Sequence, residues 1–571
     1  MPPVSPFRWG VASFEPRADA VLLWTRLPPG HGQATWQLAA DPDLHDVVAS
    51  GHEPAMADRD HTVCVDATGL KSGTTYWYRF GAAGSRSPIG RTRTLPEAPV
   101  DRLRIGYVCC SRYSVAPLGV YRALAEREVD LVVHLGDYIY EDDDKRGPRR
   151  HRPPWPAVTL ADYRERMAQL REDPDCQALH LRHPMTAIWD DHDIADNAWR
   201  GGAKSHDEAE QGPWADRVKA AARARQEWLP SRLRQPDRAE VTWRSVVVGD
   251  LAELVLLDTR SARDQQPGED DSPDRDDPRR SLLGDDQRAW LQERLADVSR
   301  PWSIVHSGVV ISELALRLPP VPGLDPLLPS GYEVADGMVI HDDQWDGYPA
   351  ERARVARWLG ERGRAGGRTL VMSGDVHSSW AFDGPTDPDW DGDGDGAGDD
   401  GGGNPPAVAV EVTVPATSSV PMSRTHPPAM WRVLDWSVRH MSHVRWAEVT
   451  ERGYAIVDLT ADRAVAEWWF VDPFHGDPTG TAELGATFRT DRAAWPPRWA
   501  PAPPVPDPDR PGLPESLPAR PTDLARMRWR RRCQRGLETV VTMAAVGAPV
   551  IALLARRRRA QAGPSRRLRR E

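Results

Sequence analysis

Four short segments in the middle of the sequence place metal-binding side chains at the ends of apolar runs. The apolar runs have the composition of buried strands, and the segments are Cys109-Cys110-Ser111, HLGDYIYED (134–142), IWDDHDIADN (188–197) and SGDVHSSW (373–380). In open α/β sheets, ligands bind at the carboxyl ends of the strands, so four loops that are far apart in sequence can converge. A metal site needs several oxygen, nitrogen or sulfur donors on a rigid frame. The four segments together therefore predict a metal centre.

Taken singly, each of these residues has a simpler interpretation. Asp137 could cap the helix that follows its strand, because aspartate is a favoured N-cap residue. A lone His192 is more often a histidine with satisfied hydrogen bonds than a ligand, and a lone Cys110 is more often a small buried apolar residue. The metal interpretation is favoured because the four segments occur together.

The pattern of apolar residues indicates the elements that would hold these segments. From about residue 11 to residue 99, short runs rich in Val, Leu, Thr, Tyr and Trp alternate with Gly, Pro and Asp, which is typical of a small antiparallel β-sandwich. From residue 102 onward, strand patterns such as RLRIGYV alternate with helix patterns such as GVYRALAERE. This alternation predicts an α/β domain with parallel strands.

These patterns divide the 571 residues into four regions. We expect an N-terminal β-sandwich domain (1–99), an α/β domain (100–478), a proline-rich linker (479–528) and a basic tail (529–571). The tail contains an apolar segment at about 538–555, whose uncharged part, 539–555, is at the lower limit of the roughly 17–25 residues of a membrane helix. A spanning helix and an amphipathic or partner-docking helix explain this segment equally well.

Composition narrows the classes of function. A net charge of −11 argues against nonspecific nucleic-acid binding, which needs a concentrated basic surface. Five cysteines without a CxxC pair argue against a disulfide framework or a zinc finger. The N-terminus has no basic n-region, apolar h-region or twin arginine, so no export signal is expected. We therefore expect a cytoplasmic protein, with membrane anchoring through the C-terminal segment as the alternative.

Six motifs resemble those of one enzyme family. They are, in order, VASFEPRADAVLLWTRL, HLGDYIYED, WDDHD, GDLAELVLLDTRSARD, WDGYPAERARV and SGDVHSSW. Over about residues 7 to 475 the chain resembles the PhoD-like alkaline phosphatase D family of the calcineurin-like metallophosphoesterase superfamily. The resemblance implies an α/β fold: a four-layer metallophosphoesterase β-sandwich flanked by helices, preceded by a small all-β domain of immunoglobulin or fibronectin type.

The resemblance also implies metal ligands at the matching positions. Asp137 would bridge two cations, Tyr140 would bind ferric iron as a phenolate, and Cys110 would take the family's cysteine position. The choice between Cys109 and Cys110 stays open, because both neighbours of the cysteine differ from the family pattern Ser-Cys-Gln. The other implied ligands are Asp191, Asp375, His377 and, on a looser pattern, His306.

The activity implied by the resemblance is hydrolysis of phosphate esters, as a phosphomonoesterase or phosphodiesterase. Fe³⁺ and Ca²⁺ are the implied cofactors, with a metal-bound hydroxide attacking phosphorus in line. His192 would contact the scissile phosphate or protonate the leaving group, and Arg112 and Arg260 would steady the phosphate oxygens. Two alternatives remain: a catalytically silent, membrane-associated scaffold, and a nucleic-acid phosphodiesterase that uses the basic tail.

Overall fold

A computed structural model describes most of the chain. The described residues are 5–143, 147–267, 275–314, 316–317, 332–335, 338–390, 404–422, 441–474 and 481–519. Within these ranges, none of the helices is both long enough and apolar enough to cross a membrane. The apolar segment at 538–555 and the basic tail lie outside the described residues.

The larger of two central sheets has ten strands in the order β25-β24-β23-β22-β9-β10-β11-β1-β2-β5. Strands β9, β10 and β11 run parallel to one another at its centre. Each consists mainly of apolar residues and is buried on both faces, as expected for parallel strands covered on both sides, and each also contains one buried polar residue, Arg104, His134 or Thr186. The ten strands are β1 (Val11–Phe14), β2 (Ala20–Arg26), β5 (Thr62–Thr68), β9 (Leu103–Val108), β10 (Leu131–Leu135), β11 (Met185–Ile188), β22 (Gly453–Leu459), β23 (Arg463–Phe470), β24 (Glu483–Asp491) and β25 (Ala500–Pro501).

The second central sheet has seven strands in the order β12-β13-β14-β18-β20-β19-β21. Strands β13, β14, β18 and β20 are parallel. At one edge of the sheet, β12 forms an antiparallel hairpin with β13. The seven strands are β12 (Arg244–Val248), β13 (Ala252–Leu256), β14 (Trp302–Ser307), β18 (Arg368–Ser373), β19 (Ser379–Phe382), β20 (Val410–Thr413) and β21 (Val444–Glu448). A separate small sheet is formed by β15 (Leu316–Arg317), β16 (Tyr332–Ala335) and β17 (Met338–His341).

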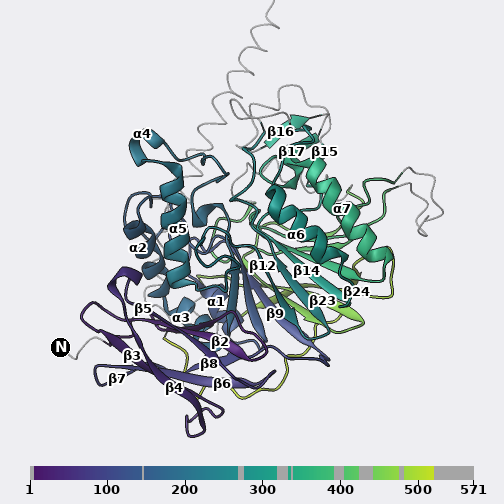
Figure 1. Cartoon of the computed structure of the whole chain (residues 1–571). Helices are drawn as coiled ribbons and strands as arrows, with labels where there is room; N and C mark the ends of the chain where they lie inside the picture. Colours follow the sequence, from purple (N-terminus) through teal and green to yellow (C-terminus); the bar gives the residue numbers. More distant parts are fainter. Residues whose placement is uncertain are drawn as a thin grey trace, which may run out of the picture.

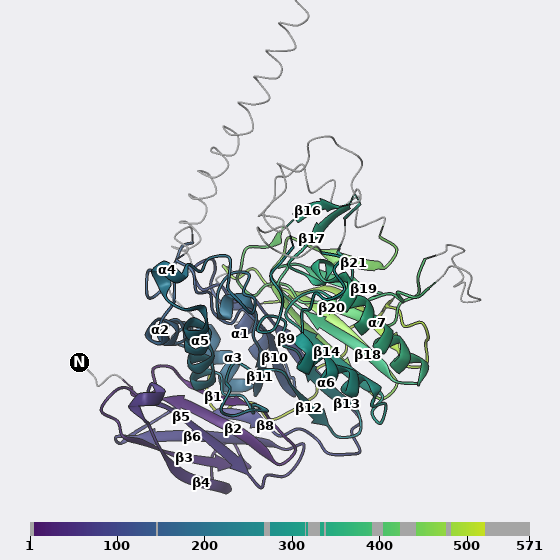
Figure 2. The same ribbon diagram turned by 45° about the horizontal axis from the view of Figure 1, so that its top comes forward.

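The two central sheets face each other and carry helices on their outer faces (Figures 1 and 2). Side chains such as Ile105 and Leu254 form the core between the sheets. One set of helices packs on the outer face of the ten-stranded sheet, and two further helices pack on the seven-stranded sheet. This order of helix, sheet, sheet and helix confirms the predicted four-layer α/β fold. The packed helices are, on the first side, α1 (Gly119–Ala125), α2 (Leu160–Arg171), α3 (Pro174–Arg182) and α5 (Trp214–Trp228), and on the second, α6 (Gly284–Ala296) and α7 (Pro349–Arg364); the short α4 (Glu208–Gln211) has no buried residue and precedes α5.

Local sequence signals set the starts of the helices that lie behind the centre of the large sheet. Helix α2 begins with a capping box, in which the Thr159 hydroxyl and the Asp162 carboxylate accept each other's backbone N–H groups. Helix α3 begins with Asp173 as N-cap and Pro174 as its first residue, where the missing N–H of proline costs nothing. These caps fix the helices whose buried faces support β9, β10 and β11.

The N-terminal region forms a sandwich that shares one layer with the ten-stranded sheet. Its own five-stranded sheet packs against β1, β2 and β5 through a core that contains Leu23, Tyr78 and Phe80. Strand β1 pairs in parallel with β11 through Phe14 and Met185, so the large sheet runs without a break across the expected domain boundary at residue 99 (Figure 2). The five strands are β3 (Gln33–Ala39), β4 (Val47–Pro54), β6 (Thr75–Ala82), β7 (Ser85–Arg86) and β8 (Gly90–Arg93).

Residues 481–519, which the sequence assigns to a linker, contribute two strands and then follow the surface of the protein. After β25, the Asp507 carboxylate accepts hydrogen bonds from Arg104 at 2.8 Å and from Arg127 at 2.7 and 2.9 Å. Further on, the Gly512 carbonyl accepts a hydrogen bond from Trp77 Nε1 at 3.0 Å. Arg510 and Glu515 also form ion pairs with the domain, with Asp130 at 2.7 Å and with Arg79 at 3.6 Å, and these contacts hold the segment in place.

We expect Asp507→Ala to lower the free energy of unfolding by about 2 kcal/mol, because the fully buried Arg104 loses one of its carboxylate partners. Urea unfolding of the full chain, followed by tryptophan fluorescence, would measure the change. Asp509→Ala is the matched control, since Asp509 is exposed in the same segment. Equal midpoints for the two variants would contradict a stabilising role for the Asp507 contacts.

Candidate metal centre

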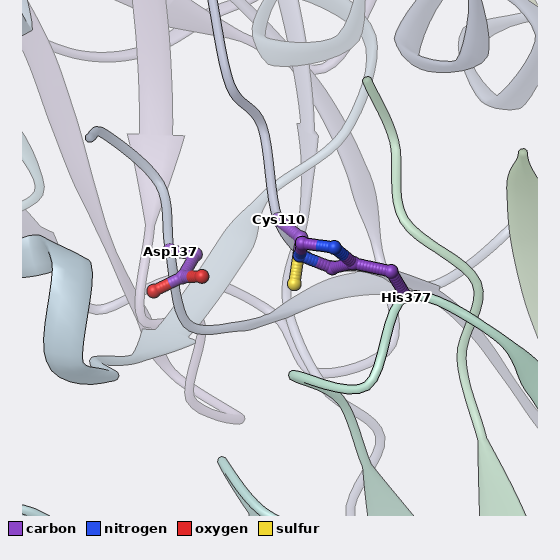
Figure 3. Close-up of side chains that lie close together, drawn as sticks. All are labelled: Cys110, Asp137 and His377. Carbon is purple, nitrogen blue, oxygen red and sulfur yellow. The ribbon is translucent and has the colours of Figure 1, made fainter. Parts of the chain in front are cut away.

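The loops that follow the carboxyl ends of β9, β10, β11 and β18 converge at one point. Figure 3 shows Cys110, Asp137 and His377 directed toward one another from separate loops. Each of these residues has a donor atom within 4.8 Å of the donor atoms of the other two. Asp137 belongs to two more groups that meet the same distance limit, one with Asp191 and His192, and one with Asp190, Asp191 and Asp375. The carboxylate of Asp137 is therefore common to all three groups.

The backbone at these positions is strained. Four residues other than glycine have positive φ angles: Cys110 (55°), Asp137 (57°), Asp375 (64°) and His377 (52°). A left-handed conformation in such residues costs of order 1–3 kcal/mol each and persists where the surrounding structure enforces it, commonly at functional sites. At Cys110 and Asp137 the two neighbouring loops enforce it, because the N–H of Cys110 donates to the Gly136 backbone carbonyl and the N–H of Ser111 donates to the Asp137 backbone carbonyl.

Gly136 allows the loops after β10 and β11 to approach closely. Its φ is +101°, and an added Cβ would lie 2.5 Å from the Cβ of Asp190. Only glycine satisfies both the positive φ and this contact. The close approach brings Asp137 beside the Asp190–Asp191 pair.

Tyr140 lies within the group formed by the Cys110 thiol, the Asp137 carboxylate and the His377 imidazole. Its hydroxyl donates to Asp137 Oδ2 at 2.7 Å and lies 3.2 Å from His377 Nε2. Its ring packs against the guanidinium of Arg112, 4.6 Å from the ring centroid, and against the ring of His192, with centroids 4.3 Å apart. Burial and the Asp137 carboxylate raise the pKa of Tyr140 well above its ordinary value. A phenolate at this position therefore needs a cation beside it.

His192 forms a buried pair with Glu141, a residue that the sequence analysis did not single out. The Nδ1 of His192 lies 2.8 Å from Glu141 Oε2, and the second carboxylate oxygen accepts the N–H of Asp196 at 2.8 Å. Burial alone would lower the pKa of His192, but the carboxylates of Asp191 and Glu141 raise it well above its ordinary value. His192 is thus an imidazolium that carries a proton on each ring nitrogen. Its Nδ1–H is directed at Glu141, and its Nε2–H lies on the other side of the ring.

The carboxylates on the other side of Asp137 surround one arginine. Arg260 is fully buried, its Nη1 and Nη2 lie 2.8 and 3.1 Å from the Asp343 oxygens, and its Nε donates to Asp190. Its Nη2 is also 3.6 Å from Asp191 and 3.8 Å from Asp375. All of these contacts are with carboxylates, so the guanidinium is a fixed counter-charge inside the acidic group.

The donor set fits metal ions. Burial is the main reason that the pKa of Asp190 is raised to about 7, and Asp191 raises it further against the opposing effect of Arg260. Burial, with Asp190 and Asp343, likewise raises the pKa of Asp375. Asp190 Oδ2 and Asp191 Oδ1 are buried without a hydrogen-bond partner among the described residues. Buried carboxylate oxygens that lack a hydrogen-bond donor and repel one another are a suitable environment for cations.

Two of the candidate residues point away from this centre. His306 lies within β14 in the core between the sheets, with Nδ1 3.2 Å from the Val255 carbonyl and Nε2 3.3 Å from the Tyr107 hydroxyl. Burial lowers the pKa of His306 to about 4, so it is neutral. The thiol of Cys109 faces the Val414 carbonyl at 3.4 Å, whereas the thiol of Cys110 faces Asp137 and His377.

Gln344 is a further contact of the centre that the sequence analysis missed. Its side-chain carbonyl accepts the N–H of Val310 at 2.7 Å, so its amide nitrogen is the group that donates to Asp375 Oδ2. Both Gln344 and Asp343 directly precede the motif WDGYPAERARV. Their position beside a family motif is the sequence signal that could have identified them. For Glu141 the corresponding signal is its position next to Tyr140.

Comparison with known proteins identifies the family of the chain. A family model described as PhoD-like phosphatase matches residues 105–468, and the model of the PhoD-like phosphatase N-terminal domain matches residues 2–96. Alkaline phosphatase D of Bacillus subtilis (strain 168) is 33% identical over 399 residues, which cover 66% of this chain and 65% of that protein, just under two thirds of its length. The solved structure of PhoD aligns with a TM-score of 0.73 at 25% identity, over 95% of this chain and 99% of that one. The chain belongs to the PhoD-like phosphatase family.

Proposed function

We propose that the protein is a metal-dependent hydrolase of phosphate esters, a phosphomonoesterase or phosphodiesterase of the alkaline phosphatase D type. The observation that carries this proposal is the position of Asp137. Its carboxylate belongs both to the donor set with Cys110 and His377 and to the donor set with Asp190, Asp191 and Asp375. One oxygen donor shared by two donor sets is what a site with two or more cations requires. Membership of the PhoD-like phosphatase family supports the same activity.

The two donor sets differ in chemistry, which supports two kinds of cation. Cys110, Tyr140 and His377 offer sulfur, phenolic oxygen and nitrogen, a set that suits a transition metal such as Fe³⁺. The carboxylates on the other side of Asp137 offer only oxygen, a set that suits Ca²⁺. When bound, the cations would make water a better nucleophile at neutral pH and would neutralise charge on the phosphate oxygens.

The protein's own cationic side chains have separate roles in this proposal. His192, whose proton on Nδ1 is held by Glu141, would donate a proton from Nε2 to the leaving-group oxygen. Arg112 would bind a phosphate oxygen, because its guanidinium lies against the same Tyr140 ring as His192 and is partly exposed, although it also forms an ion pair with Asp142. The Tyr140 ring would thereby set the spacing between the two groups.

The role that we propose for Arg260 differs from the phosphate contact predicted from the sequence. Its side chain is fully buried, and its nitrogens are directed at carboxylates. We propose that it orients Asp190 and Asp375 and offsets part of their charge. It would thus position metal ligands without touching the substrate.

Asp137→Asn should abolish retention of metal and lower turnover of para-nitrophenyl phosphate and its bis-ester by at least about 100-fold, because both cation sites lose their shared donor. Mass spectrometry of metals in the purified full chain and initial rates with and without Ca²⁺ and chelator would measure both effects. Asp286→Asn, at an exposed position of α6, is the control and should match the wild type. Full metal content in Asp137→Asn would refute the bridging role.

His192→Ala should keep its metal and lower kcat by about 10²–10⁴-fold, the usual size of a general-acid contribution. The reason is that Nε2 of His192 is proposed to protonate the leaving group, whereas Asp137 and Asp191 still hold the cations. Parallel metal analysis and steady-state kinetics separate the two effects. His52→Ala, on the exposed face of β4, controls for the loss of an imidazole. Loss of metal together with activity would make His192 a ligand instead.

A further inference from the structure

A segment outside all of the recognised motifs runs beside the cysteine loop. Residues 416–422 follow β20, and Ala416 forms an isolated parallel bridge with Cys109. The N–H of Thr417 donates to the Cys109 carbonyl at 2.9 Å, and the N–H groups of the next two serines donate to the Cys110 carbonyl at 3.3 and 3.2 Å. This segment therefore continues the pairing past the end of β9 and fixes the backbone of Cys110.

The same segment contacts two more of the proposed donors. The Ser419 hydroxyl lies 2.8 Å from the Tyr140 hydroxyl and 3.0 Å from the Cys110 carbonyl. The Val420 carbonyl accepts a hydrogen bond from Nδ1 of His377 at 2.9 Å. This bond places the proton of His377 on Nδ1, so the lone pair of Nε2 is directed toward Tyr140.

Ser419 is a hydrogen-bond donor to Tyr140, and it is fully buried. As a neutral phenol, Tyr140 donates its proton to Asp137 and accepts a hydrogen bond from Ser419. As a phenolate, Tyr140 has no proton to donate, and the Ser419 hydroxyl still donates to it. The single Ser419 proton can go to the Cys110 carbonyl or to Tyr140, and a charged oxygen is the stronger acceptor.

We infer that Ser419 is a positioning residue whose hydroxyl holds the Tyr140 oxygen beside Asp137 and His377, where that oxygen would bind a cation. The inference rests on the proposed function, because it concerns the same metal centre. In this inference, residues 416–422 form a loop that supports Cys110, Tyr140 and His377. Groups that orient metal ligands in this way typically contribute 10–100-fold to metal affinity.

Ser418 provides a matched control in the same loop. It is the adjacent residue, it is buried, and its N–H donates to the same Cys110 carbonyl. Its hydroxyl, however, donates to the Arg112 carbonyl at 3.0 Å and not to Tyr140. Ser418→Ala and Ser419→Ala therefore remove the same atom from neighbouring positions, and only the second removes the bond to the phenol.

The test measures metal retention of the full-length variants Ser419→Ala, Ser418→Ala, Tyr140→Phe and the double variant Ser419→Ala/Tyr140→Phe. After dialysis against a chelator, we expect Ser419→Ala to lose iron about 10-fold faster than wild type and Ser418→Ala to lose it at the wild-type rate. In the Tyr140→Phe background, Ser419→Ala should have no further effect, because its partner oxygen is absent. In the iron-loaded protein, the phenolate-to-iron absorption band should move to longer wavelength in Ser419→Ala.

The outcomes separate this inference from the proposed function. A wild type that retains no metal and turns over neither ester would overturn the proposed function and this inference with it. A metal-retaining wild type with equal retention in Ser419→Ala and Ser418→Ala would overturn the inference alone. It would also be overturned if Ser419→Ala accelerated metal loss equally in the Tyr140→Phe background, because Ser419 would then act through the Cys110 backbone.

Discussion

The close approach of four carboxylates, three of them buried, is the constraint on which the rest of the structure depends. The oxygens of Asp137, Asp190, Asp191 and Asp375 approach within 4.8 Å, where two unit charges at an effective dielectric constant of about 20 repel by roughly 3 kcal/mol or more. Arg260, held by Asp343, offsets part of this repulsion from inside the protein. Bound cations would offset the remaining repulsion. The left-handed backbone conformations at Cys110, Asp137, Asp375 and His377 direct side chains to the same cluster.

Much of the fold and the core of the candidate site could be predicted from the sequence, for a definite physical reason. Parallel buried strands have long apolar runs, and the polar residue that ends each run lies at the edge where such strands present their ligands. This logic applies to Cys110, Asp137 and Asp375, each of which lies two residues beyond the end of its strand. It does not apply to His306, which looks similar in sequence but lies inside β14, where its side chain belongs to the core.

The contacts that the sequence did not reveal depend on pairing between distant segments. Ser419 approaches Tyr140 because residues 416–419 lie beside residues 109–112, and no pattern in either segment specifies its neighbour. Gln344 reaches Asp375 from the segment before α7 in the same way. The continuity of the large sheet across residue 99 depends on a single parallel pairing, Phe14 with Met185. Periodicity predicts elements, but it does not predict which elements meet.

The order of strands in the ten-stranded sheet has a consequence for synthesis on the ribosome. Strand β9 pairs on one side with β10, which follows it closely, and on the other with β22, which begins at Gly453. At about 5–20 residues per second, roughly 20–70 s pass between the emergence of β9 and that of β22. During that time β9 presents an unpaired edge beside the loop that carries Cys110, and open edges invite association with other chains. Molecular chaperones that cover this edge would therefore favour the yield of folded protein.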